Sequence, residues 1–365
     1  MAQYQIYNEK TQKKIMRPKI TFPANLLEKI QTPHYILNDH RVPTFRIQDN
    51  LKAVVVGVNV SGEENGTENW NLNVMDGLAF AKFLREEWGV HEKHPEPYKE
   101  PVKDPLVLDE KVKAMVQKDG KPKEKVEKEL LEEMLAQEKV HEKEMQVLTG
   151  AVKLQEVLDA LDKMCSSSTA EENVLFYYSG PSMAVDGNTY LLFADSYLED
   201  VPGNTGEKIL KNSLSLVALH RRFLQTNAKV KAAFFDCNYS GQTMPVLPDL
   251  VMEPEERLKD VIYYGDDLPD RMTEDMVVPD SGWFTMAACD LDQFAYESDQ
   301  LGGGVFTYIL IKTLKNREAR RNDQQMSLED VKLYVSNELM NSVGSAGFCQ
   351  VPQFQCDIVG KIRME

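Results

Sequence analysis

The sequence predicts an α/β protein in which helices sandwich a mostly parallel central sheet. Three apolar runs rich in β-branched or aromatic residues are typical of strands buried on both faces: 51–60, 173–179 and 230–236. Segments with helical periodicity alternate with these runs, and such alternation is typical of parallel sheets covered on both sides. The chain has 365 residues, of which 42% are hydrophobic, so it is able to bury a sizeable core.

The remaining elements continue this alternation along the chain. Helices are expected over 71–88, 154–164, 213–224, 305–314 and 327–341, and further strands over 282–289 and 354–358. Gly89 is placed to end the first helix, and Ser327 with Asp330 has the spacing of a capping box at the start of the last. Sites in such sheets lie beyond the carboxyl ends of the strands, so the segments just after Ser179 and Asp236 are the candidates.

Two segments depart from the alternating pattern. Residues 1–50 are mixed in composition and predict an extended N-terminal arm with little structure of its own, and 359–365 predict a short C-terminal tail. Residues 91–148 are charged and Pro-rich, and predict a helical insertion that interrupts one domain spanning 51–358. The insertion is either a solvated spacer or a partner-binding helix that uses Leu130, Leu131, Met134 and Leu135.

Charge and cysteine usage restrict the function classes. The net charge of −16 argues against nucleic-acid binding, which requires clustered Lys and Arg. The five cysteines form no C-x-x-C pair, and neither an apolar leader nor a run of membrane-spanning length is present. These features predict a cytoplasmic protein without a membrane span. The glycine patterns of phosphate and dinucleotide sites are missing, so no cofactor is expected.

Four motifs carry a resemblance to a known family. They are FYYSGPS (176–182) with DGNTYLLFAD (186–195), FFDCNYSG (234–241), MAACDLDQFAYE (286–297) with GGGVFTY (302–308), and QVPQ (350–353). Their order and their positions at strand ends resemble the caspase-like cysteine peptidases of the metacaspase type, whose corresponding motifs include S-G-H-G and D-A-C-H-S-G. The resemblance covers 51–90 and 150–358 and implies a caspase-like fold.

The resemblance also implies that the catalytic residues are missing. Pro181 stands at the histidine position and Asn238 at the cysteine position, and neither supplies the base or the nucleophile that peptide hydrolysis requires. Cys237 directly precedes Asn238, but successive side chains of a strand point to opposite faces. Cys237 should therefore point away from the face of Asn238 and pack in the core. We therefore expect a catalytically inactive pseudopeptidase that serves as a scaffold, regulatory or structural binding protein. The alternatives are a residual peptidase that cleaves after Arg or Lys with Cys237, and a structural subunit of a cytoskeletal or flagellar assembly.

Some of the positions that match the family's motifs belong to its recognition pocket. Asp76, Ser179 and Asp236 match pocket residues of the family, which implies a remnant able to hold a basic side chain. Alternatively, Ser179 and Asp236 only satisfy backbone groups at strand ends. Asp195 matches one calcium ligand of the family, so only weak calcium binding is implied and no complete metal site. The expected partners are other proteins, bound through the insertion and the N-terminal arm.

Overall fold

The computed structural model describes residues 3–4, 17–31, 45–59, 72–92, 143–185, 188–200, 208–241, 281–315, 326–359 and 362–364. Its main feature is a seven-stranded sheet with the order β14-β11-β10-β6-β3-β5-β4. In that order the strands are Gln353–Val359, Ser281–Ala287, Val230–Asp236, Asn173–Ser179, Leu51–Val58, Glu144–Gly150 and His91–Glu92. Only the pairing of β14 with β11 is antiparallel. The predicted fold class, a mostly parallel sheet between helices, is confirmed.

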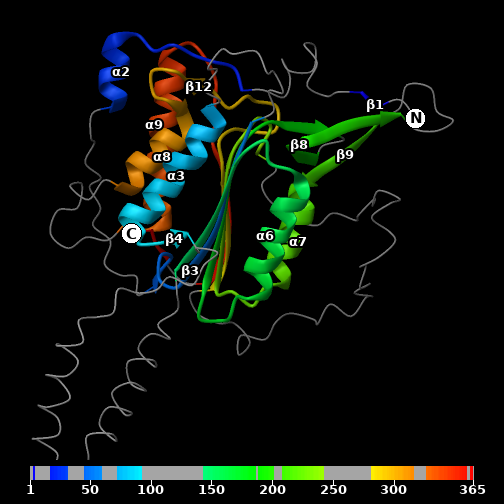
Figure 1. The fold of residues 1–365 in the computed structure, drawn as a ribbon. Helices are drawn as coiled ribbons and strands as arrows, with labels where there is room; N and C mark the ends of the chain where they lie inside the picture. Colours follow the sequence, from blue (N-terminus) through cyan, green and yellow to red (C-terminus); the bar gives the residue numbers. More distant parts are fainter. Residues whose placement is uncertain are drawn as a thin grey trace, which may run out of the picture.

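Two layers of helices cover the sheet (Figure 1). On one face lie α2 (Ala24–Gln31), α3 (Leu72–Trp88), α8 (Val305–Lys315) and α9 (Leu328–Ser345); on the other lie α6 (Leu154–Ser166) and α7 (Leu216–Gln225). Successive strand residues face opposite layers, so Phe234 joins the first core and Phe235 the second. This explains why the buried strands are apolar throughout rather than alternating.

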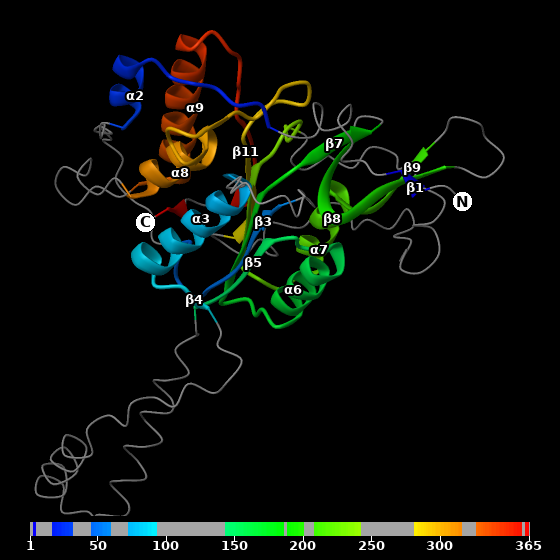
Figure 2. The same ribbon diagram turned by 45° about the horizontal axis from the view of Figure 1, so that its top comes forward.

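A second, four-stranded sheet continues from the carboxyl end of β6 (Figure 2). It contains β1 (Gln3–Tyr4), β7 (Ser182–Val185), β8 (Asn188–Asp200) and β9 (Lys208–Ser215). Two short pairs complete the described elements: β12 (Glu297–Ser298) with β13 (Gly303–Gly304), and β2 (Phe45–Arg46) with β15 (Ile362–Arg363). None of the helices that the structure describes is long and apolar enough to cross a membrane.

The predicted boundaries are correct for most buried elements. Strands 173–179 and 230–236 match β6 and β10, and Ser327 with Asp330 forms the expected capping box at α9. The range 91–148 needs correction at both ends, because His91–Glu92 and Glu144–Gly150 are strands of the central sheet. These strands lie at or next to its edge and keep polar, partly exposed residues, which hides a buried-strand signal. The rest of the predicted insertion, including its apolar stripe, lies outside the described residues.

The N-terminal range 1–50 also differs from the expected unstructured arm. It contains helix α2, and Ile20, Phe22 and Ile30 are buried in the core that α3, α8 and α9 share. Apolar burial explains the order of this segment, because three buried side chains together contribute several kcal/mol, at about 1.5–3 kcal/mol each. The C-terminal tail likewise contributes a strand, Ile362–Arg363, and a buried Met364.

Candidate functional site

Pro181 and Asn238, the two positions that the resemblance matches to catalytic residues, lie side by side at the carboxyl edge of the sheet. Strands β6 and β10 are neighbours, and their register pairs Ser179 with Asp236, two residues before each position. Asn238 is fully buried, and its side-chain oxygen accepts a hydrogen bond from the Ala295 amide at 3.0 Å. Its carbonyl accepts another from the Ser182 hydroxyl at 2.6 Å. The asparagine therefore connects the end of β10 with the segment that leads to β12 and with Ser182, the first residue of β7.

Pro181 has a similar structural role. It is buried, and its carbonyl accepts hydrogen bonds from the Tyr178 hydroxyl at 2.7 Å and from the Leu192 amide at 3.0 Å. These bonds fix the chain where β6 passes into β7. Neither Pro181 nor Asn238 presents a group that takes up a proton or attacks a carbonyl carbon.

Cys237, the neighbouring thiol, is packed in the core as expected. It is fully buried in the cluster that contains Phe176 and Phe235. Burial, reinforced by the nearby Cys289, raises the pKa of the Cys237 thiol well above its ordinary range. Because the thiolate is the nucleophilic form, a thiol held in the protonated state is a poor nucleophile.

The two histidines that the structure describes lie far from this thiol. His220 packs against Trp283 with ring centroids 5.0 Å apart. Trp283 pairs with Lys231, six residues before Cys237 along β10, which corresponds to roughly 20 Å. His91 is exposed and lies at the opposite, amino edge of the sheet, where it pairs with Glu144. Neither histidine is positioned to accept a proton from Cys237.

Next to Pro181 and Asn238 lies an acidic pocket built from Asp76, Ser179 and Asp236. The Ser179 hydroxyl donates to Asp76 at 2.9 Å, and the Gly304 amide donates to the other Asp76 oxygen at 2.7 Å. Asp236 accepts hydrogen bonds from the Thr307 amide at 3.1 Å and from the Thr307 hydroxyl at 2.6 Å. The structure thus brings Asp76, Ser179 and Asp236 together as the sequence predicted.

Close packing of α3 on β3 places Asp76 in this pocket. A Cβ added to Gly57 would lie 2.7 Å from the Asn73 carbonyl, and one added to Gly77 would lie 3.1 Å from the Gly57 Cα. The two glycines therefore allow the amino end of α3 to approach the carboxyl end of β3. Asp76 reaches the edge of the sheet because of this crossing.

The pocket is filled by an arginine of the same chain. One terminal nitrogen of Arg17, Nη2, lies 2.6 Å from both Asp76 Oδ2 and Asn73 Oδ1. The other, Nη1, lies 2.7 Å from Asp236 Oδ1, and Glu297 Oε2 is 3.5 Å from Nη2. The Arg17 side chain is 1% exposed, so the guanidinium is enclosed by three carboxyl groups.

The charged groups in this cluster shift one another's pKa values. Burial lowers the pKa of Arg17, but Asp236, Asp76 and Glu297 outweigh it and hold that pKa above its ordinary value, so Arg17 stays charged. Burial raises the pKa of Asp76 to about 7; Arg17 opposes this shift and Asp236 adds to it. Burial raises the pKa of Glu297 as well, again against the effect of Arg17. One guanidinium therefore does not fully neutralise the three carboxyl groups.

Because two neighbouring residues are glycines without side chains, there is room for these charged groups. A Cβ on Gly303 would overlap with Asp76, and a Cβ on Gly304 would overlap with both Asp236 and Arg17. Both residues form β13, which pairs with β12 and so places Glu297 beside the pocket. Side chains at these two positions are excluded by the packing of the cluster.

Sequence reasoning missed four residues of the pocket: Arg17, Asn73, Glu297 and Thr307. Glu297 and Thr307 belong to the matched motifs and were available as candidates. The alternation of polar and apolar residues from Lys19 to Phe22 was the available signal that this segment is extended and half-buried. Nothing in one sequence pairs Arg17 with Asp76, which lies 59 residues away.

Asp195, the predicted calcium-site remnant, lies elsewhere. Its side chain accepts a hydrogen bond from the Leu154 amide at 3.0 Å and thereby caps the start of α6. Within the described ranges, no group of three or more His, Cys, Asp or Glu side chains is arranged to hold a metal ion. Asp195 thus stabilises a helix end and lies apart from the acidic pocket.

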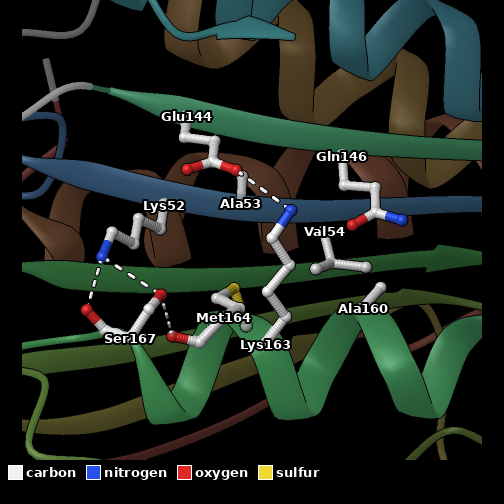
Figure 3. A pocket seen from close by; sticks show the side chains of 9 residues that line it. All are labelled: Lys52, Ala53, Val54, Glu144, Gln146, Ala160, Lys163, Met164 and Ser167. Atoms are coloured by element: carbon white, nitrogen blue, oxygen red, sulfur yellow. Dashed lines mark hydrogen bonds and ion pairs between the residues drawn. The ribbon is translucent and has the colours of Figure 1, made fainter. Parts of the chain in front are cut away.

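A second hollow lies at the amino ends of β3 and β5, against α6 (Figure 3). Its charged groups already have partners: Lys52 is 3.1 Å from Glu172, and Lys163 is 3.6 Å from Glu144. It encloses about 260 Å³, open solvent included, which is below the range of most ligand pockets. We assign no binding role to it.

No family model matches the chain, and no curated protein matches it. Among solved structures it is similar to protein GSU0716 from Geobacter sulfurreducens, at 12% identity and a TM-score of 0.37, covering 85% of this chain and 92% of that chain. It is also similar to pro-sf-caspase-1, at 9% identity and a TM-score of 0.38, covering 90% and 98%. Caspase-1 from Spodoptera frugiperda matches at 9% identity and a TM-score of 0.37, covering 91% and 97%. Caspases are therefore among the solved structures that this fold resembles.

Proposed function

We propose that this chain is a non-catalytic binding protein, a pseudopeptidase whose motifs resemble those of metacaspases. The observation that carries this proposal is the state of the two catalytic positions. Asn238 is buried and bonded to the Ala295 amide, and Pro181 has no side-chain group that titrates. A peptidase of this kind needs a nucleophile and a base at these two places.

The alternative of a residual peptidase would have to use Cys237. Its thiol is buried, its pKa is raised, and the two described histidines lie at other parts of the sheet. A thiol in apolar packing is more often a structural residue than a nucleophile. These observations favour the binding role.

The proposed role is that of a cytoplasmic scaffold, regulatory or structural subunit with protein partners. Its net charge of −16 favours basic partner surfaces over nucleic acid. The carboxyl edge of the sheet, with its buried carboxylates, is the candidate binding surface. The inference that an enzyme fold without chemistry persists as a binding surface is an analogy at the level of the fold.

Hydrolysis of fluorogenic peptides with Arg or Lys before the reporter tests this proposal, measured with and without calcium. The control is Cys237→Ala, which removes the thiol that directly precedes Asn238 in the chain. We expect equal, background rates for both proteins. Turnover by the native chain that is lost in Cys237→Ala would show that the protein is a peptidase.

A further inference from the structure

We infer that the surface formed by α7 and the amino ends of β10 and β11 binds an acidic segment of a protein partner, and that Lys231 holds the carboxylates of this segment. The surface lies at the opposite edge of the sheet from the acidic pocket. Its role is independent of whether the protein hydrolyses peptides. Three observations support it: the charge of this part of the chain, the lack of an anionic partner for Lys231 among the described residues, and the aromatic ring beside it.

The stretch from Lys208 to Phe235, which forms β9, α7 and β10, is basic within an acidic chain. It contains four lysines, two arginines and no Asp or Glu, whereas the whole chain has 58 acidic and 42 basic residues. Lys208 and Lys211 lie on the second sheet, where Asp200 and Glu199 face them. The cations from α7 to β10 therefore form a local positive surface on a chain with a net charge of −16.

Lys231 is the second residue of β10, and its side chain points toward the layer of α6 and α7. Ala233 and Phe235 share this face of the strand and lie in the core beneath these helices. Lys231 is half-buried, and burial lowers the pKa of its ammonium group. In the part of the chain that the structure describes, it makes no ion pair and no side-chain hydrogen bond. Its charge is thus partly removed from water without a compensating partner.

A comparable lysine of the same layer is paired. Lys52 lies two strands away at the same level, because Val174 pairs with both Lys52 and Lys231 in the sheet. The Lys52 ammonium group lies 3.1 Å from Glu172 and donates to the Ser167 carbonyl at 2.7 Å. Lysines that are withdrawn from water are normally paired in this way. The difference favours an anionic partner for Lys231 that another molecule supplies.

An aromatic side chain beside Lys231 gives the surface an apolar part. Trp283 on β11 is its register partner, and register partners in neighbouring strands point to the same face of the sheet. Trp283 is partly buried, and His220 of α7 packs against its ring with the centroids 5.0 Å apart. An indole ring supplies a hydrogen-bond donor and an apolar surface for the methylene groups of an acidic side chain.

The charges around the ring limit the kind of anion that fits. Arg221 on α7 adds a second cation that makes no ion pair with another described residue. On the other side of Trp283, β14 places the exposed carboxylate of Asp357. The carbonyl ends of α6 and α7, which are partly negative, also lie at this edge of the sheet. These negative groups favour single carboxylates spread along a chain over a compact, doubly charged phosphate.

The test is the binding of a labelled peptide of alternating Glu and Gly to the full chain, measured by fluorescence anisotropy. The same peptide with Gln in place of Glu is the control ligand, and inorganic phosphate is added as a competitor at constant ionic strength. Lys231→Met removes the charge and keeps a long apolar side chain. Lys208→Gln is the matched control, because it removes one positive charge from the same basic stretch at an ion pair with Asp200.

We expect Lys231→Met to bind the Glu peptide at least about 10-fold more weakly than the native chain, because a charge-assisted hydrogen bond is lost. Lys208→Gln should change binding by less than about twofold. Trp283→Leu should weaken binding at unchanged charge. Without peptide, Lys231→Met should be at least as stable to urea as the native chain, because it removes a desolvated charge without a partner among the described residues.

Equal binding of the Glu and Gln peptides would overturn the inference, as would failure of the native chain to bind the Glu peptide. Equal losses in Lys231→Met and Lys208→Gln would also overturn it, because net charge alone would then explain the binding. Displacement of the peptide by phosphate would show that the surface takes phosphate groups instead. A marked loss of stability in Lys231→Met would show that the lysine has a structural role, which contradicts the inference as well.

Discussion

At the residue scale, the protein depends on one buried guanidinium held among three carboxyl groups. Arg17 contacts Asp76 and Asp236 at 2.6 and 2.7 Å. Desolvation makes such a cluster costly to assemble, and removal of one partner from a buried pair typically costs about 3–5 kcal/mol. Arg17 also fixes where the N-terminal segment lies, because its guanidinium contacts residues of α3, β10 and β12.

The raised pKa of Asp76 predicts an unusual dependence of stability on pH. Its pKa is about 7 in the folded protein, against an ordinary value of 3.8. Between these values the unfolded chain releases a proton that the folded chain keeps, so stability falls as pH rises from about 4 to about 7. The slope is at most about 1.4 kcal/mol per pH unit. Glu297, whose pKa burial also raises, adds a slope of the same sign.

Urea unfolding of the native chain and of Asp76→Asn across this pH range tests the prediction. The stability of the native chain relative to the variant should decrease from pH 4 to pH 7. Asp162→Asn, which removes an exposed carboxylate on α6, controls for the loss of one negative charge. If the stability of the native chain relative to Asp76→Asn stays constant or increases with pH, the pKa of Asp76 is not raised in the folded protein.

Gly304 is predicted to tolerate no side chain. An added Cβ would overlap with Asp236 and Arg17, so Gly304→Ala should destabilise the protein by about 1–3 kcal/mol, as overpacking does. Gly344 in α9 has nothing within 4 Å of an added Cβ, so Gly344→Ala should be neutral or stabilise by up to about 1 kcal/mol. Chemical denaturation measures both. Equal effects of the two substitutions would show that the pocket is not packed as described.

Part of this site could be predicted from the sequence, because its residues belong to continuous motifs. Pro181 and Asn238 follow recognisable strand ends, and Asp76, Ser179 and Asp236 were expected in one pocket and are found there. Arg17 could not be predicted, because its partners come from distant parts of the chain. An arginine next to a proline in a polar segment has no local property that marks it as buried.

At the scale of elements, the docked segment 17–22 begins at a charged anchor, Arg17, and pairs with Glu297 through two backbone hydrogen bonds. Phe22 is 2% exposed within the main core, so Phe22→Ala should destabilise the protein by about 3–5 kcal/mol and release the segment. Thr21 lies next to it and faces solvent, so Thr21→Ala should change stability by less than about 0.5 kcal/mol.

Limited proteolysis combined with denaturation measures this release. Phe22→Ala should expose the bonds around Lys19 to trypsin, and Thr21→Ala should protect them as the native chain does. Native-like protection in Phe22→Ala would mean that Arg17 alone holds the segment in place.

Strands could be predicted from the sequence where all of their residues are equally buried. Strands β6 and β10 are buried along their length, and their apolar composition gave their bounds. Strand β5 was missed because six of its seven residues are only partly buried, next to the short edge strand β4. The antiparallel strands β7 to β9 were missed for a similar reason, and an irregular register between β8 and β9 further weakens the alternation.

At the scale of the whole molecule, the parallel sheet brings the polar and charged residues of the site together at its carboxyl edge. The carboxyl ends of β6 and β10 meet the amino ends of α3 and α8 and the docked N-terminal segment there. Parallel sheets bind their ligands at this edge. Asn238, Pro181 and the pocket that Arg17 fills lie there in this molecule.

Reaction with an electrophilic peptide probe tests the non-catalytic account most directly. A peptidyl-arginine fluoromethyl ketone would be incubated with the native chain and with Arg17→Ala, in which the pocket is emptied, and intact mass would be measured. We predict no adduct on Cys237 in either protein, because its thiol is buried and its pKa is raised. A stoichiometric adduct on Cys237, above all one that forms only in Arg17→Ala, would contradict the account and reveal a peptidase inhibited by its own N-terminal segment.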